Sequence, residues 1–371
     1  MKQPLFIAAG PAMAASTAEE RNAGLDGLRG YAAIVVVVFH SVLGLDATQI
    51  ERILRGHWSN FDPYEGLTKI FLKIFDGEAA VMLFFVLSGA VLFRSLMREE
   101  DGIGGVAVKF YVRRVFRIYP ALFVCLVACS LAFAASGRGI TLDDFISNAL
   151  LYDFKVNGAT WTLNAEMIAP LFLLLSYLGY RAGKEWGLAF VAFGLMYLLE
   201  LPQLDGYLTY FRGSWYCFAL GALIPTRAGR AVASALPTWS WIGAIACAIV
   251  LRWPLREASI AVLVAMVYYR RTPAIEAFLS GSISQFLGRI SFSFYLFNVL
   301  FLELICDRVR QYPWAAAHPL EAGIGVAAVV IACTIPVARI SWTCIEMPFN
   351  RLGHRLTGRS RITSAAQPAV P

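Results

Sequence analysis

Long apolar runs, separated by short charged stretches, dominate the chain. The runs last about 14–25 residues, and a helix needs about 20 to cross ~30 Å of hydrocarbon. None alternates with the period of two of an outer-membrane barrel strand, and in lipid a helix pairs its own backbone groups. The pattern predicts an all-α integral membrane protein, a polytopic bundle of about ten transmembrane helices, near residues 30–46, 79–96, 110–135, 160–180, 187–201, 213–226, 239–251, 257–270, 289–306 and 321–346. Two of these runs, 213–226 and 239–251, are short, so nine or eleven spans also fit.

Composition agrees with a bilayer protein, since 58% of the 371 residues are hydrophobic and 15% are charged, against about a quarter charged in soluble domains. No internal repeat or flexible linker divides the chain. We expect a membrane domain over residues 24–356, an N-terminal tail over 1–23 and a cytoplasmic C-terminal tail over 357–371. A short apolar stretch within residues 1–20 is either a cleaved signal or part of a loose cytoplasmic tail.

The distribution of basic residues predicts the orientation. With a cytoplasmic N-terminus, 21 of the 32 Lys and Arg residues fall on the cytoplasmic side, which indicates that both termini are cytoplasmic. The net charge of +7 favours contact with membrane lipid and gives no indication of nucleic acid, because the basic residues flank the spans. The seven cysteines lie in or beside apolar runs and are expected to pack in the core, with no metal site.

Two ionisable residues share one face of the first predicted span. Arg29 and His40 are eleven positions apart, so they project within about 20° of each other and lie roughly 16 Å apart along the axis. An arginine can bind a phosphate and a histidine can move a proton. The distance between the two residues suits an elongated donor such as an acyl-CoA, held at its phosphates with its thioester farther in. The alternative is a topology anchor at Arg29 and a packed histidine. Asp26 either orients Arg29 or caps the helix, and capping is the simpler interpretation.

A second basic feature begins the third span. Arg114 and Arg117 lie on one helical face and could bind cofactor phosphates, or they could serve only as the positive-inside signal.

A carboxylate begins the fourth span. Glu166 could hold a protonated His40, or it could cap the helix or face an external vestibule. Trp161 and Asn164 would line the same cavity mouth, and Glu78 lies on the outer side, where an acceptor could be received.

Other polar residues have simpler explanations. Ser88 lacks the turn of a nucleophilic serine, so close helix packing at Ser88 and Gly89 accounts for it better. His318 and His354 are expected in loops.

Several segments together resemble the acyltransferase 3 family, membrane O-acyltransferases that modify bacterial glycans, antibiotics and lipids. Residues 25–40 resemble its opening span, and later blocks follow in the family's order across roughly residues 24–356, at 84–93, 111–122, 160–166, 290–298 and 345–356.

The resemblance implies acyl transfer, commonly acetyl from acetyl-CoA, to a hydroxyl presented across the inner (cytoplasmic) membrane. By this resemblance, Arg29 and His40 correspond to the family's arginine-and-histidine motif. Arg114 and Arg117 correspond to its paired arginines, and Glu166 to the carboxylate of the block at residues 160–166. Met82 and Asn298 depart from the pattern, where an aspartate and a histidine are frequent, and this puts acceptor contacts in question. No fused esterase-like domain is expected after the last span.

The mechanistic expectation is that His40 acts as a base toward the acceptor hydroxyl, or alternatively accepts the acyl group covalently. A rival function is a transporter or flippase that uses Arg29, His40 and Glu166 as a proton or substrate pathway. A non-catalytic scaffold would leave the shared face of Arg29 and His40 unexplained. The sequence leaves open the acceptor, the acyl chain and the oligomeric state.

Overall fold

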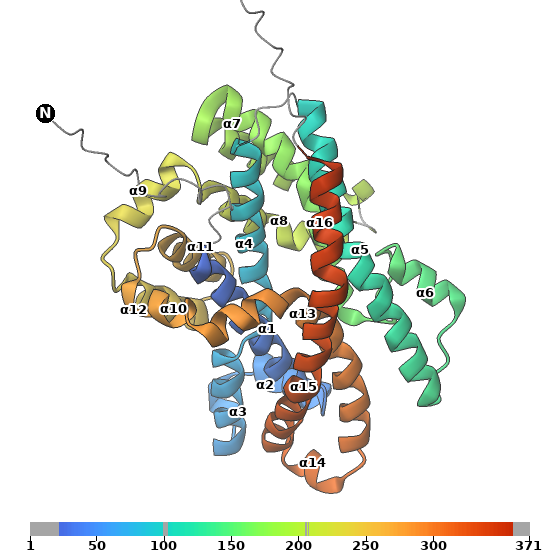
Figure 1. Cartoon of the computed structure of the whole chain (residues 1–371). Coiled ribbons are helices and arrows are strands. Elements are labelled where there is room, and N and C mark those ends of the chain that lie inside the picture. The colour runs from blue at the N-terminus through green and yellow to red at the C-terminus, as the bar shows by residue number, and fades with distance from the viewer. Residues whose placement is uncertain (1–21, 99–102, 205, 207, 359–371) are drawn as a thin grey trace, which may run out of the picture.

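The computed structural model describes residues 22–98, 103–204, 206 and 208–358, and every regular element in those ranges is helical (Figure 1). A π-helical turn, Trp342–Glu346, joins the last two helices. The helices are α1 (Ala23–Leu43), α2 (Ala47–Arg55), α3 (Pro63–Ile74), α4 (Gly77–Arg98), α5 (Ile103–Ala135), α6 (Leu142–Ala149), α7 (Trp161–Leu199), α8 (Thr209–Leu223), α9 (Arg227–Ala235), α10 (Ser240–Val250), α11 (Leu255–Tyr268), α12 (Pro273–Leu279), α13 (Ser282–Val309), α14 (Pro313–Ala317), α15 (Pro319–Ser341) and α16 (Met347–Leu356).

The all-α membrane fold is confirmed, whereas the count of about ten spans is not. In the described ranges six helical segments are long and apolar enough to cross a bilayer, and the bent pair α9 and α10 would make a seventh. Helices do form at the remaining predicted spans, but α8, α10 and α11 have only 15, 11 and 14 residues. A full crossing takes about 20 residues, so these three helices are short for one.

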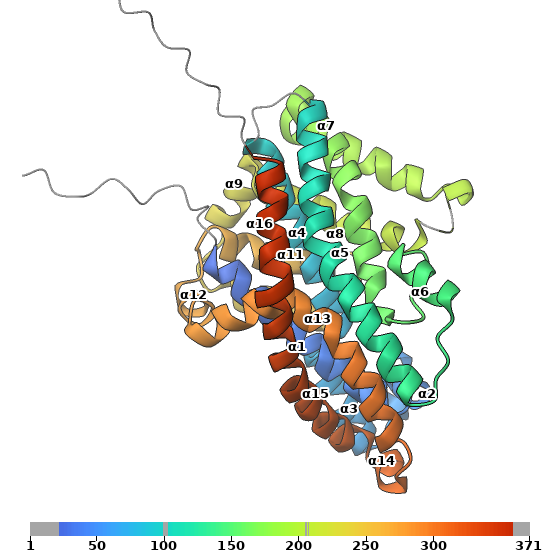
Figure 2. The ribbon, with the colours of Figure 1, turned by 45° about the vertical axis from the view of Figure 1, so that its right-hand side comes forward.

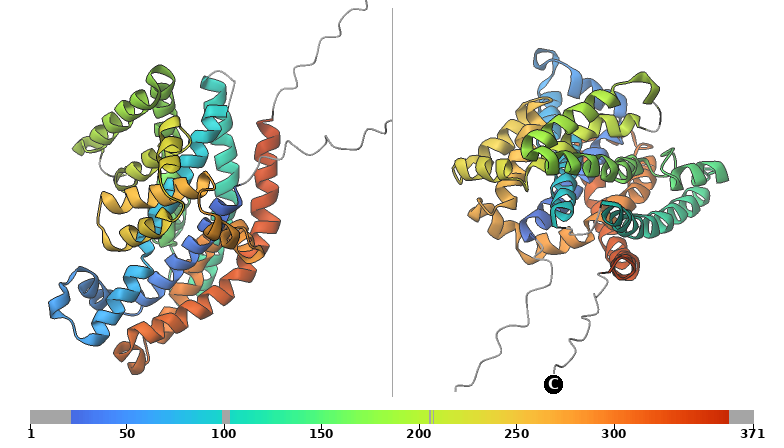
Figure 3. Two further views of the ribbon diagram at one scale, coloured as in Figure 1. Left: turned by 90° about the vertical axis from the view of Figure 1, so that its left-hand side faces the viewer. Right: turned by 90° about the horizontal axis from the view of Figure 1, so that it is seen from above.

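The predicted spans 160–180 and 187–201 both lie within α7, which has a sharp break. Gly183 and Lys184 leave the helical conformation, and Lys184 adopts a φ of 52°. A side chain added at Gly187 would collide with the backbone of Gly179, so the two arms of α7 turn back and touch (Figure 3). Gly179 and Gly187 have no side chains, which permits this close approach of the two arms.

Helix α1 runs through the middle of the bundle, where it packs against α13, α4 and α15 (Figure 2). Glycines bring α1 and α13 together: a Cβ added at Gly30 would lie 2.7 Å from the backbone nitrogen of Gly288. Small residues allow such backbone contact between membrane helices, where lipid supplies little hydrophobic drive. The helix that carries Arg29 and His40 is therefore held on several sides.

The start of α1 corrects one expectation. Asn22, not Asp26, caps the helix, because its side-chain oxygen accepts hydrogen bonds from the backbone N–H groups of Gly24 and Leu25. Its amide also donates to the carbonyl of Tyr268, at 3.0 Å. Asp26 instead pairs with Arg29, 3.4 Å away.

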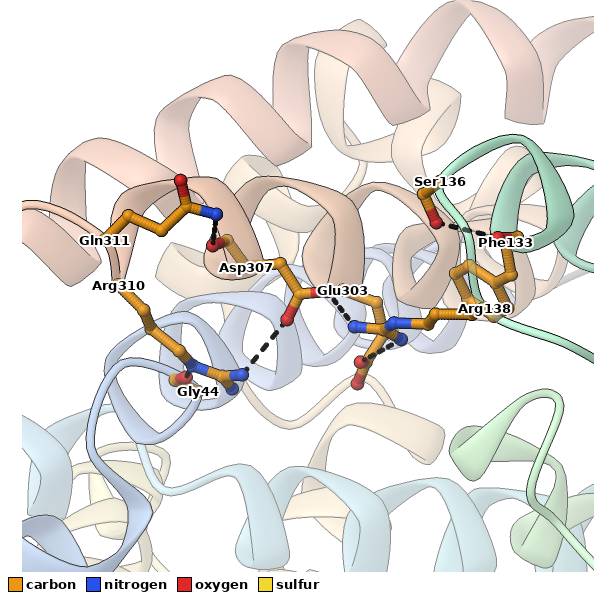
Figure 4. Close-up of polar contacts among 8 residues, drawn as sticks. All are labelled: Gly44, Phe133, Ser136, Arg138, Glu303, Asp307, Arg310 and Gln311. Carbon is orange, nitrogen blue, oxygen red and sulfur yellow. Dashed lines mark hydrogen bonds and ion pairs between the residues drawn. The ribbon is translucent and has the colours of Figure 1, made fainter.

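The other end of α1 is tied to α13 by an ionic network (Figure 4). Arg310 donates from Nε to the carbonyl of Gly44 and from Nη1 to Asp307, at 3.1 Å. Arg138, just after α5, pairs with Asp307 and with Glu303. Because the N–H of Gly44 donates to the carbonyl of His40 at 2.8 Å, the network restrains the helix turn that holds the histidine.

The predicted tails fall largely outside this description. Residues 1–21, including the candidate signal, and residues 359–371 are not among the described residues.

Candidate active site

A buried ion pair joins α5 to α7 deep in the bundle. Arg114 donates from Nη2 to Oε2 of Glu166 at 2.9 Å and from Nε to the main-chain carbonyl of the same residue at 2.6 Å. The Arg114 side chain is 6% exposed and that of Glu166 is 22% exposed. Arg114 lies eleven positions into α5, about 16 Å from its start.

Two further arginines stand near this pair. The charges acting on the Arg29 guanidinium come from Arg117, Asp26, Glu166 and Glu346, so α1 and α5 contribute to one cluster. Arg29 is paired with Asp26. Half-buried Arg117 forms no hydrogen bond or ion pair with another described residue. A cation held in this way is available to an anionic ligand.

The imidazole of His40 is half-buried and held in one orientation. Its Nδ1 lies 2.8 Å from the carbonyl oxygen of Val36, one turn earlier in α1. A carbonyl can only accept, so Nδ1 carries the proton and Nε2 keeps a free lone pair. The ring of Phe39 contacts the imidazole edge to face. The arrangement leaves Nε2 able to take a proton.

The predicted partnership of Glu166 with His40 stays a prediction. The described contacts of Glu166 are with Arg114 and with Ser88, whose hydroxyl donates to Oε1 at 3.2 Å. Those of His40 are with Val36 and Phe39. Glu166 therefore belongs to the arginine cluster in this conformation.

A cavity of about 510 Å³ lies beside the histidine end of α1. Predicted residue Glu78 is part of its wall, as is Phe39. The wall is formed by Phe39, Leu43, Glu51, Leu54, Arg55, Lys73, Asp76, Glu78, Leu251, Arg252, Trp253 and Arg256. Its volume falls within the ~300–1,000 Å³ typical of small-molecule sites.

Trp161 and Asn164 lie elsewhere. Asn164 donates to the carbonyl of Leu151 at 2.9 Å and borders a second, smaller cavity of about 210 Å³. The ring of Trp161 contacts Phe85. In the loop that borders this second cavity, the hydrogen bond from Lys155 lowers the pKa of the Asp153 carboxyl.

The structure adds three residues to the site, of which Ser88 had been assigned to helix packing alone. The hydroxyl of Ser88 donates a hydrogen bond to Glu166. Tyr295 is close enough for its phenol to interact electrostatically with the same carboxylate. Glu346 is 7% exposed, accepts a hydrogen bond from Ser293 and acts on Arg29. Its position as an acidic residue within an apolar run was the available signal. Gly89 does pack as expected, against the backbone of Phe218.

Both departures from the family pattern are accommodated by packing. Buried Asn298 donates to the carbonyls of Phe294 and Tyr295 in its own helix. The sulfur of Met82 contacts the thiol of Cys217 at 3.4 Å.

Comparison with known proteins places this site in a family context. Residues 22–338 match the family model for the acyltransferase 3 domain. A relative in Staphylococcus aureus strain COL, named Putative O-acetyltransferase, is 23% identical across 89% of this chain, and so is its counterpart in strain N315. This chain spans 57% of the length of those relatives.

Nodulation protein 10 of Rhizobium leguminosarum biovar viciae is 23% identical, over 80% of this chain and 88% of its own length. No solved structure matches the chain. The family model extends from the cap of α1 to Ala338 in the last turn of α15, and thus includes the arginine cluster, the histidine and both cavities. The chain therefore belongs to the acyltransferase 3 family.

Proposed function

We propose that this protein is an O-acyltransferase of the bacterial inner membrane that transfers an acyl group, acetyl from acetyl-CoA, to a hydroxyl of a glycan. The observation that carries the proposal is the 2.8 Å contact of His40 Nδ1 with the carbonyl oxygen of Val36, which orients the imidazole on the helix that also holds Arg29. The family membership and the names of the S. aureus relatives support the same class of reaction.

The donor would bind at the arginine cluster. Arg117 lacks an ion-pair partner among the described residues, and Arg29 and Arg114 flank it. Guanidinium groups bind phosphates through two hydrogen bonds at once. With the CoA phosphates there, the thioester would extend about 16 Å along α1 toward His40.

At His40 the chemistry needs a base and no metal ion. Nε2 removes the proton of the acceptor hydroxyl, and the oxygen attacks the thioester carbonyl carbon. The C–O bond forms, the C–S bond breaks, and the imidazolium returns its proton to the departing sulfur of CoA. Glu166, if the donor displaces it from Arg114, would be free to stabilise the imidazolium.

A covalent variant of the same reaction has two halves. Nε2 of His40 attacks the thioester directly, CoA leaves, and the acceptor hydroxyl then takes the acyl group from the histidine. Radiolabelled acetyl-CoA distinguishes the two: without acceptor, only the covalent route leaves label on the protein after an acid quench.

The membrane orientation is part of the proposal. The distribution of basic residues favours cytoplasmic termini, and the arginine cluster would then open toward cytoplasmic acetyl-CoA. The 510 Å³ cavity, whose wall includes Glu78, the residue predicted on the outer side, would then receive the acceptor.

The experiment compares His40→Ala with the unaltered protein in cells that carry their native surface glycan. We expect O-acetylation, measured by mass spectrometry of the glycan, to be lost while the variant keeps its thermal unfolding midpoint in detergent. His318→Ala is the matched control, because His318 is exposed and stacks on Trp314 away from the site. Undiminished acetylation in His40→Ala would refute the proposed role.

A further inference from the structure

We propose that the 510 Å³ cavity selects an acidic saccharide, with Lys73 and Arg252 binding the carboxylate or phosphate of the acceptor. The inference rests on the proposed function, since it treats this cavity as the acceptor site. It adds the chemical class of the acceptor and two specificity residues that the family motifs do not include.

The two cations come from different segments of the cavity wall. Lys73 is in the last turn of α3, and Arg252 lies between α10 and α11. Neither forms a hydrogen bond or ion pair through its side chain within the described ranges. Both charges act on Lys69, which is itself engaged with the carbonyl of Gly56 and the ring of Trp58. Three like charges therefore lie near one another at this side of the bundle.

Every other cation in the wall is already neutralised. Arg256 contacts three carboxylates, those of Glu78 at 3.1 Å, Asp76 at 3.5 Å and Glu257 at 2.9 Å. Arg55 pairs with Glu51 at 3.6 Å. The lining thus combines an anionic cluster around Arg256 with two cations, Lys73 and Arg252, that have no ion-pair partner among the described residues. An anionic group is attracted to these two cations and repelled by the carboxylates around Arg256, which orients it in the cavity.

The remaining lining suits a sugar ring. Trp253 is 62% exposed and Phe39 is half-buried, so the cavity offers aromatic faces as well as charge. Glu78 is 64% exposed and can accept hydrogen bonds from sugar hydroxyls. A few polar groups in an aromatic-lined hollow are the usual composition of small-molecule sites.

The cavity also lies next to the reacting group. Phe39 and Leu43 line it from α1. At 100° per residue, Leu43 projects about 60° from His40 and Phe39 about 100° from it, in the same rotational direction. His40 therefore sits at the edge of the cavity-facing side of α1, where a hydroxyl of a bound sugar could reach Nε2.

The test compares two probes that differ in one group. Methyl β-D-glucuronide carries a carboxylate where methyl β-D-glucoside carries a hydroxymethyl group. Binding to the purified full-length protein is measured by saturation-transfer NMR without acetyl-CoA. We expect the glucuronide to bind about tenfold or more tightly, the usual effect of a charge-assisted hydrogen bond. In Lys73→Gln/Arg252→Gln the preference should disappear while glucoside binding is unchanged.

Matched controls remove a charge elsewhere. Lys155→Gln deletes a lysine outside this cavity, and we expect it to keep the preference. The single variant Arg252→Gln checks that a lost preference is not caused by unfolding, because Arg252 is exposed and has no ion-pair partner among the described residues. We expect this variant to lose part of the preference for the glucuronide while its unfolding midpoint stays unchanged. Equal binding of the two probes by the unaltered protein, or an unchanged preference in the double variant, would overturn the inference.

Two further arms separate the sources of failure. His40→Ala should retain the glucuronide preference even though acetylation is lost, so the selectivity is judged independently of the proposed reaction. Phosphatidylglycerol nanodiscs test a lipid headgroup as the anion. Loss of glucuronide binding there, but not in phosphatidylcholine nanodiscs, would assign the cations to lipid and overturn the saccharide inference.

Discussion

Arg114 holds Glu166 by two atoms at once, the carboxylate and the main-chain carbonyl, at 2.9 and 2.6 Å. The double contact fixes the first turns of α7 against the middle of α5. Ser88 of α4 donates to the other carboxylate oxygen. Three helices are thereby joined through one acidic residue.

Breaking this pair from one side should be costly. Arg114→Ala leaves a mostly buried carboxylate without its cation, and we expect the free energy of unfolding to fall by about 3–5 kcal/mol. Arg114→Met/Glu166→Leu removes both charges and should recover most of the thermal unfolding midpoint without restoring acetyl transfer. If the double variant were as unstable as Arg114→Ala, the cost would come from packing instead of from the unpaired charge.

Arg117 should affect the donor and not the fold. Arg117→Gln removes no ion pair between described residues, so the unfolding midpoint should stay unchanged. The KM for acetyl-CoA should rise about tenfold or more, through loss of a phosphate contact. S-acetyl-pantetheine, which lacks the nucleotide phosphates, is the matched donor. An equal rise in KM for both donors would argue against phosphate binding by Arg117.

The contact between α1 and α13 should not tolerate a side chain. In Gly30→Val the added atoms meet the backbone of Gly288, and overpacking of this kind costs about 1–3 kcal/mol. We expect a lower unfolding midpoint and reduced acetylation, because α1 carries both Arg29 and His40. Gly66→Ala is the comparison, since nothing lies within 4 Å of the added carbon there. Equal stability of Gly30→Val and Gly66→Ala would contradict the close approach.

The network at the end of α1 should matter for rate. Arg310→Ala releases the carbonyl of Gly44, and we expect kcat to fall about ten- to hundredfold as His40 loses its fixed position. The KM for acetyl-CoA should be unchanged, because the arginine cluster is at the other end of the helix. Arg308→Ala removes an exposed charge from the same helix end and should leave both constants unaltered. A KM effect in Arg310→Ala would indicate a wider disturbance of the bundle.

The sequence predicted the positions of the helices better than it predicted how many of them span the membrane. Apolar runs located α1, α4, α5 and α13, because long apolar helices need nothing beyond composition to be recognised. The same rule could not judge α8, α10 and α11, because helices of 15, 11 and 14 residues are shorter than a full crossing and also fit buried or re-entrant segments. The reversal at Gly183 depends on a contact between Gly179 and Gly187 that no local pattern reveals.

The sequence predicted some residues of the candidate site but not their arrangement. Arg29, Arg114 and Glu166 do gather in one charged cluster. Helical spacing could relate Arg29 to His40, which share α1, but pairings between helices such as Arg114 with Glu166 depend on tertiary packing. For the same reason the sequence could not predict that Lys73 and Arg252, which are far apart in the chain, line the same cavity.

The eleven-residue interval in α1 has a mechanical consequence. Between Arg29 and His40 the helix contains no proline and no break, so inserting one residue would rotate everything beyond it by about 100° while lengthening the helix by only about 1.5 Å. A histidine displaced in this way would face a different neighbour helix. The segment can therefore exchange one apolar side chain for another of similar volume, but it cannot gain or lose a residue.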